Sequence, residues 1–121
     1  MSPTLALMIG SVVAILAGLG FALAPAQLLS GFGFTAPPEA VVVTRDIGVT
    51  LMGLGILNWL ARDAVGPALR AILIGNLFIQ VAELVVNGWE IAVGLIPAQA
   101  AGGIVLHIVL GALFLLALRR A

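Results

Sequence analysis

The chain has 121 residues, of which 63% are hydrophobic and only 8% are charged, and its net charge is zero. A soluble domain carries about 25% charged residues, and a chain this short cannot bury so much apolar surface in a water-soluble core. The composition therefore predicts an integral membrane protein and excludes a separate soluble domain. The basic residues form no cluster of the kind that binds nucleic acid. The absence of cysteine excludes disulfides, thiolate metal ligands and cysteine nucleophiles.

The first apolar segment, residues 4–23, is predicted to be a retained membrane span. A bilayer core about 30 Å thick needs roughly 20 apolar residues in a helix, and this segment has that length. A cleaved signal peptide has a basic start and a small-residue cleavage site. Here "MSPT" carries no basic residue, and the small residues Ala22 to Ala24 are followed at once by Pro25. The Gly- and Pro-rich stretch 24–40 is expected to interrupt the helix.

Three further segments, 41–61, 69–87 and 100–118, have the length and apolarity of membrane spans. The polar turn "RDAVGP" separates the second span from the third. The sequence leaves open whether residues 88–99 prolong the third helix or form a loop at the membrane interface. We therefore expect an all-α fold, a four-helix transmembrane bundle that occupies residues 1–121 as a single domain.

The distribution of arginine predicts the orientation of this bundle. Four of the five arginines lie on the side that holds both termini and the second connection: Arg62, Arg70, Arg119 and Arg120. The positive-inside rule then places both termini in the cytoplasm, in a multi-pass protein of the plasma membrane. Trp59 and Trp89 are expected near opposite membrane faces, where tryptophan anchors helices to the interface.

Small residues recur at helical spacing in the spans and indicate how the helices associate. Membrane helices pack through small side chains and interhelical hydrogen bonds, because lipid supplies no hydrophobic drive between them. The small residues are Gly10, Ala14 and Gly18 in the first span, Gly48, Gly53 and Gly55 in the second, and Gly103 and Gly111 in the fourth. Close packing of the bundle or of an oligomer is favoured over a binding groove. Asn58 is expected to cap a helix or to bond to another one.

A polar stripe in the third span is the main departure from this apolar pattern. Asn76, Gln80, Glu83 and Asn87 follow one another at spacings of four, three and four residues. At about 100° per residue they fall within an arc of roughly 60°. Polar and ionised groups rarely face lipid, because their transfer into hydrocarbon costs several kcal/mol. The stripe should therefore face the bundle interior, a partner subunit or a water-filled cavity.

Depth along the helices predicts which ionisable groups meet. With a rise of about 1.5 Å per residue, Arg45, Asp46, Glu83 and His107 all fall in the outer half of the membrane. We expect Arg45 to neutralise Glu83. His107 and Gln80 would hydrogen-bond around that pair, and Asp46 would be a second carboxylate. Such a network either fixes helix register, forms a site for a ligand, ion or proton, or contacts another membrane subunit.

His107 lies midway between Gly103 and Gly111 and has two further interpretations. It is either a packing histidine or a ligand of haem or chlorophyll, since the glycines would leave room for a flat ring. A haem held by two histidines would need two chains, because this chain has one. There is no P-loop, dinucleotide-binding glycine motif, HExxH or plausible Ser–His–acid triad. No catalytic residue, no metal site and no enzyme activity are therefore expected.

Three stretches in order carry a resemblance to known proteins: "LAPAQLLSGFGF", "TRDIGVTLMGLGILNWLARDA" and "LRAILIGNLFIQVAELV", followed by a Gly-rich last helix. The chain resembles small four-helix bacterial membrane proteins of unknown function, similar to the DoxX-like group. The resemblance covers most of the chain and implies a four-helix topology in a bacterial inner membrane. It implies no activity. Small multidrug exporters are less similar, because their membrane carboxylate lies in the first helix and this first helix has none.

Two functions remain open at this point. The favoured one is a non-enzymatic structural or accessory subunit, which packs in a homo-oligomer or a larger complex within the lipid bilayer. The alternative is a transporter or binding module for a small molecule, ion or proton, with Glu83, Arg45 and His107 around a central cavity. The deciding feature is whether the polar stripe lines a cavity or is sealed by the chain's own side chains.

Overall fold

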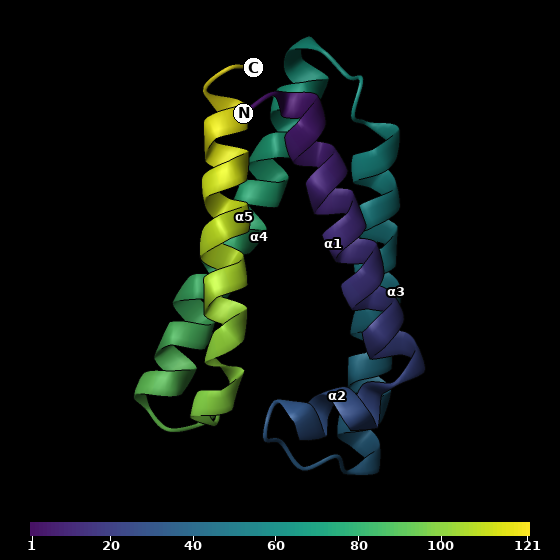
Figure 1. The fold of residues 1–121 in the computed structure, drawn as a ribbon, viewed down its shortest axis with the longest axis vertical. Helices are drawn as coiled ribbons and strands as arrows, with labels where there is room; N and C mark the ends of the chain where they lie inside the picture. The colour runs from purple at the N-terminus through teal and green to yellow at the C-terminus, as the bar shows by residue number, and fades with distance from the viewer.

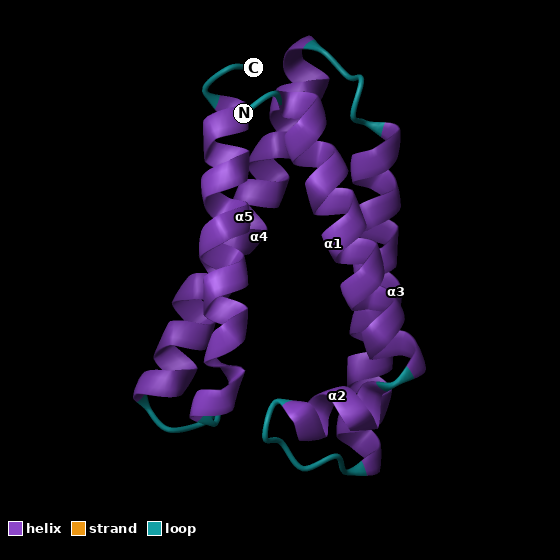
Figure 2. Cartoon of the chain, viewed as in Figure 1, coloured by secondary structure: helices purple, strands orange, loops and turns teal.

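The computed structural model describes residues 1–121, and the chain is helical throughout, with no strand (Figures 1 and 2). Four helices are long and apolar enough to cross a membrane. They are α1 (Pro3–Leu23), α3 (Pro38–Leu60), α4 (Gly66–Ala92), and a fourth that begins as the 3₁₀ turn η1 (Ala98–Ala101) and continues as α5 (Gly102–Leu118). This confirms an all-α chain with four helices of membrane-spanning length.

Proline defines where four of the helices begin. Pro3, Pro25, Pro38 and Pro67 occupy the first turn of α1, α2, α3 and α4. The fixed φ of proline suits this position, and its missing N–H group would have no intrahelical partner there. In α1 the Ser2 hydroxyl also accepts a hydrogen bond from the Leu5 amide at 3.2 Å. Two spans therefore start three residues before the predicted boundaries at 41 and 69.

Two connections differ from the expectation. The stretch 24–40 is not wholly irregular, because it contains the short helix α2 (Pro25–Gly31). The open question about residues 88–99 is settled in part, since α4 continues to Ala92 before the chain turns at Gly94. At 27 residues, α4 is about 40 Å long and exceeds the hydrocarbon thickness of about 30 Å. α4 is therefore longer than a bilayer core requires.

The helices form two pairs, α1 with α3 and α4 with α5, which make the most extensive contacts in the chain. The pairs meet at the end that holds both termini and the α3–α4 connection, and they diverge toward the other end (Figure 1). We call these the closed end and the open end. A small hydrophobic core at the closed end joins the pairs: Ala6, Leu7, Leu69, Leu73, Leu110, Phe114 and Ala117.

Glycine allows the first pair to pack backbone to backbone. A Cβ atom at Gly18 would lie 2.6 Å from the carbonyl oxygen of Gly48, and one at Gly48 would lie 2.6 Å from that of Gly18. A Cβ at Gly55 would lie 2.8 Å from the Ser11 carbonyl oxygen. No side chain fits at such distances, so three of the predicted small-residue positions do bring helices together. By contrast, Gly53 and Gly103 have open space around them.

Most large apolar side chains point outward. Only 18 of the 121 residues are buried, and Leu23, Phe78 and Leu60 are among the many exposed apolar residues. Water would solvate such a surface poorly, whereas lipid tails would cover it without cost. The surface and the four long helices are consistent with a multi-pass membrane protein.

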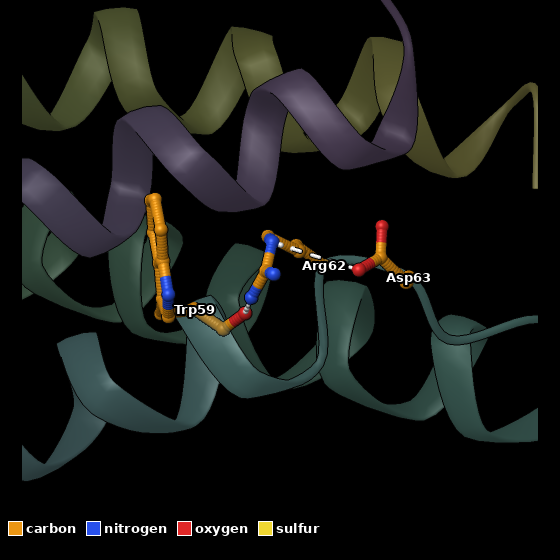
Figure 3. A network of polar contacts seen from close by, with 3 residues as sticks. All are labelled: Trp59, Arg62 and Asp63. Atoms are coloured by element: carbon orange, nitrogen blue, oxygen red, sulfur yellow. Dashed lines mark hydrogen bonds and ion pairs between the residues drawn. The ribbon is translucent and has the colours of Figure 1, made fainter.

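The closed end carries most of the arginine. Arg70 donates a hydrogen bond to the carbonyl oxygen of Ala121 at 3.3 Å, which ties the start of α4 to the C-terminus. Arg62 stacks on Trp59 with 4.7 Å between its Cζ and the ring centre. It also donates to the Trp59 carbonyl at 2.7 Å and pairs with Asp63 at 3.6 Å (Figure 3). These contacts hold the guanidinium group over the last turn of α3.

Candidate functional site

The polar stripe of α4 begins, nearest the closed end, with a reciprocal amide pair. Asn58 of α3 donates to Asn76 of α4 at 2.9 Å, and Asn76 donates back at 2.7 Å. The second N–H of Asn76 reaches the Ile72 carbonyl at 2.9 Å. Both side chains are buried, with exposures of 1% and 3%. The pair links α3 to α4, so of the two roles predicted for Asn58, a helix cap or an interhelical bond, the structure shows the second.

The next member of the stripe joins α4 to α5. Nδ1 of His107 lies 2.7 Å from the side-chain oxygen of Gln80, which is only 5% exposed. Because a carboxamide oxygen only accepts, Nδ1 carries the hydrogen in this arrangement, and Nε2 of the neutral ring is left as an acceptor. The amide N–H groups of Gln80 donate to no protein atom. His107 and Gln80 were predicted to hydrogen-bond around an Arg45–Glu83 pair, and in the structure they bond to each other.

The predicted ion pair between Arg45 and Glu83 is wrong. Glu83 accepts one hydrogen bond, from Asn87 one turn later on α4 at 3.1 Å, and it has no basic partner. Arg45 instead donates to the carbonyl of Ala22 at 3.2 Å, at the last turn of α1. A guanidinium group is stabilised there, because the last carbonyls of a helix are unpaired and carry negative partial charge. Arg45 follows α1 because α3 packs on α1 and diverges from α4.

A central cavity of about 550 Å³ lies between the two helix pairs. Its polar wall belongs to α4 and α5 and consists of Asn76, Gln80, Glu83, Asn87 and His107. The facing wall belongs to α1 and α3 and is apolar, with Val13, Leu16, Ile47, Leu51 and Leu54 among its residues. The structure therefore brings five of the seven predicted site residues around one space, and it leaves Arg45 and Asp46 outside.

Asp46 lines a second space, the lateral groove, which runs between α3 and α4 on the flank of the bundle and measures about 970 Å³. Five residues line both this groove and the central cavity: Ile47, Leu51, Leu54, Ile79 and Glu83. The two spaces therefore meet at the seam between α3 and α4. Glu83 stands at that seam and is reached from both sides.

The loop after α2 closes part of the open end, a feature that the sequence analysis missed. Phe32 and Phe34 line the central cavity, and Gly33 between them has a φ of 82°. A Cβ at Gly33 would collide with Gln99, in η1 before α5. The first connection thus packs on the last one across the mouth of the cavity. The signal in the sequence was the pair of aromatic residues around a glycine within a Gly- and Pro-rich connection.

The arrangement offers no set of three His, Asp or Glu side chains that could hold a metal ion. His107 is a different matter, because a hydrogen bond on one ring nitrogen orients a histidine for coordination through the other. Gly103 leaves open space on this face, whereas a Cβ at Gly111 would lie 3.5 Å from the Gln80 side chain. Haem or chlorophyll at His107 stays a prediction, which an absorption spectrum of the purified protein would test.

Comparisons with protein-family models, curated proteins and solved structures found no match to this chain. The resemblance to the DoxX-like group therefore stays a prediction.

Proposed function

We propose that this protein is a small membrane protein that binds a membrane-soluble small molecule in the central cavity, either as a binding module or as the binding unit of a transporter. The observation that carries the proposal is that Glu83 and Asn87 line an open cavity instead of being sealed. Small-molecule sites are largely apolar spaces with a few convergent polar groups, and this cavity has that character. The proposal includes no catalytic step.

The state of the polar groups supports binding over pure architecture. In a network that only fixes helix register, every side-chain oxygen and nitrogen should have a protein partner, as those of Asn58 and Asn76 do. Farther along the same face, the Gln80 amide hydrogens and the Glu83 carboxylate keep hydrogen-bonding capacity that no protein group uses. Ionisable residues within membrane spans commonly mark ligand or ion pathways. Glu83 is therefore the residue on which we place the function.

The proposal places the bundle in a bacterial inner membrane, with both termini in the cytoplasm. It is supported by the four arginines at the closed end, where the termini also lie, and by the positive-inside rule. The resemblance to DoxX-like bacterial proteins supports the compartment. To test this, a fluorescent protein fused to the C-terminus should fluoresce, and alkaline phosphatase fused at the same place should be inactive, as expected for a cytoplasmic C-terminus. The reverse pattern would invert the proposed topology.

Two matched glycine substitutions test whether the cavity holds a ligand. Gly103 lines the cavity and Gly75 does not, yet a Cβ at either position would meet no atom within 4 Å. Gly103→Phe should fill the cavity, and Gly75→Phe should project a similar ring outward. A ligand would have to share the cavity with the new ring, and forcing extra volume into a filled space costs about 1–3 kcal/mol. We therefore expect Gly103→Phe to lower the amount of bound molecule by about tenfold or more.

The measurement is mass spectrometry of small molecules that co-purify with the parent protein and with each variant. A species enriched with the parent and with Gly75→Phe, but depleted in Gly103→Phe, supports the proposal. Equal amounts in all three proteins, or no such species in any of them, would contradict it. Tryptophan fluorescence and elution volume in detergent control for folding.

A second candidate function, an accessory subunit in a homo-oligomer or larger complex, is favoured by the exposure of α3. Only 11% of its span is buried, against 33% for α1. Its Gly53 faces open space, where another helix could approach closely. Native mass spectrometry in mild detergent tests this. An oligomer that Gly53→Phe dissociates would support it, and a monomer in every condition would exclude the homo-oligomer.

A further inference from the structure

The polar wall of the central cavity has more acceptors than donors. Glu83 uses only one of the hydrogen bonds that its two oxygens can accept, and the side-chain oxygen of Asn87 accepts none. Nε2 of His107 is a further acceptor in the arrangement set by Gln80. The unused donors on this wall are the two N–H groups of Gln80 and the second N–H group of Asn87. A head group that matches this wall must therefore be mainly a donor.

The charge of the cavity points the same way. Glu83 is the one ionisable carboxyl group in its lining, and no arginine lines it. The adjoining lateral groove adds Asp46 and likewise contains no arginine. Arg45, the one basic residue on the open half of α3, is held by the Ala22 carbonyl. A carboxylate in apolar surroundings is strongly stabilised by a cation that also donates hydrogen bonds to it.

Independent support for a bound molecule comes from Gln80. The residue is 5% exposed and lines the cavity, and its N–H groups donate to no protein atom. The Ser11 hydroxyl oxygen is the only side-chain oxygen or nitrogen that is fully buried without a partner, so the Gln80 amide nitrogen is reached from the cavity. An amide in such a position normally bonds to protein or to ordered water. A water held beneath the ligand is therefore expected against Gln80, because an ammonium group has no acceptor for the Gln80 N–H groups.

The remainder of the cavity suits an apolar body. Four of the five phenylalanines of the chain line it: Phe21, Phe32, Phe34 and Phe114. Aromatic faces attract cations as well as packing against hydrocarbon. The lateral groove, with Ile47, Leu51 and Ile79 in its lining, meets the cavity at Glu83. A molecule dissolved in the lipid could enter by that route without crossing water.

From these observations we infer that the cavity takes an amphiphilic amine, a primary or secondary ammonium group on an apolar body, with the ammonium on Glu83. The inference rests on the proposed function, because it names the ligand class of the same cavity. The ammonium group would donate to Glu83 and to the neighbouring acceptors. The apolar body would lie among the phenylalanines.

Three probes with the same chain test this in phosphatidylcholine nanodiscs: dodecylammonium, dodecyltrimethylammonium and dodecanol, with empty nanodiscs as the blank. Dodecylammonium carries charge and donors, the trimethyl probe carries charge alone, and the alcohol is neutral. We expect dodecylammonium to bind tightest and dodecanol weakest. Because a hydrogen bond to a charged group is strong, Glu83→Gln should weaken dodecylammonium by about tenfold to a hundredfold. The same substitution should leave the affinity for dodecanol within about twofold of the parent's.

Two variants make the result specific. Glu90→Gln removes a carboxyl group from the same helix outside the cavity lining and should change nothing. Glu83→Asp keeps the charge and should keep the preference for dodecylammonium over dodecanol. Retained dodecanol binding shows that Glu83→Gln still folds, so a loss confined to the ammonium probe is the expected result.

The outcomes separate this inference from the proposed function. If all three probes bind alike and Glu83→Gln has no effect, while Gly103→Phe weakens them all, the cavity binds amphiphiles and the amine assignment is overturned. If Gly103→Phe weakens no probe relative to Gly75→Phe, the proposed function itself is overturned. A selectivity for dodecylammonium that Glu83→Gln abolishes supports both.

Discussion

The polar face of α4 has an inner part and an outer part that differ in how their hydrogen bonds are met. In the inner part, Asn76 and its partner Asn58 satisfy each other and are buried. In the outer part, Glu83 and Asn87 bond only to each other and line the cavity. The residue types are similar and the helix is the same. The difference arises because the two helix pairs converge at the closed end and separate toward the open end.

The polar face of α4 therefore serves two purposes. Where a neighbouring helix is close, a side-chain amide holds the two helices together, and removing its partner leaves a buried polar group unpaired. Where the helices part, the same kind of side chain is available to a ligand. Gln80 lies between these regions, with one end bonded to His107 and the other unpartnered.

The largest expected effect comes from two glycines that sample the two ends. A Cβ at Gly10 would lie 2.5 Å from the Phe114 ring at the closed end, whereas one at Gly103 would meet nothing within 4 Å. Gly10→Leu should therefore destabilise the protein by about 2–3 kcal/mol, because the packed core must shift. Gly103→Leu should change the free energy of unfolding by no more than about 0.5 kcal/mol. Unfolding in mixed micelles with rising SDS measures both, and equal effects would contradict the division into two ends.

A smaller effect is expected at the amide pair. Asn76→Leu leaves the buried Asn58 without a partner and should cost about 1–3 kcal/mol. Replacing both asparagines by leucine should recover much of that loss, because no polar group is then left unpaired.

The matched control lies at the outer part of the same face. Asn87→Leu, on the cavity wall, should change stability by about 0.5 kcal/mol or less. Unfolding in SDS is measured for the parent, Asn76→Leu, the Asn58/Asn76 double variant and Asn87→Leu. If the double variant were less stable than Asn76→Leu, the two asparagines would contribute more to stability than the mutual pairing of their polar groups.

The smallest effect concerns the ion pair that does not form. Since Arg45 bonds to the Ala22 carbonyl and Glu83 to Asn87, the two residues should be energetically independent. A double-mutant cycle with Arg45→Gln and Glu83→Gln should give a coupling energy within about 0.5 kcal/mol of zero. A clearly larger coupling would restore the pair that depth alone predicts.

The sequence was sufficient for several features because they depend on local chemistry. Apolar runs of membrane length predict the four spans, although the second and third begin three residues earlier than predicted, at Pro38 and Gly66. Helical periodicity places the polar residues of α4 on one face. Depth along the helices also predicted that Gln80 and His107 take part in hydrogen bonds, and their direct bond forms because α4 and α5 pack along each other.

Other features could not be read from the chain, because a depth in the membrane does not say in which direction a side chain points. Arg45 and Glu83 share a depth, but close packing of Gly18 on Gly48 holds α3 against α1 and turns Arg45 to the end of α1. The same divergence of the pairs makes the central cavity and leaves Glu83 without a cation. Composition and periodicity thus predicted four apolar helices of membrane-spanning length and the polar face of one of them, since these depend on neighbours along the chain. Only the tertiary structure decided which part of that face is sealed and which is open, because this depends on how two helix pairs meet.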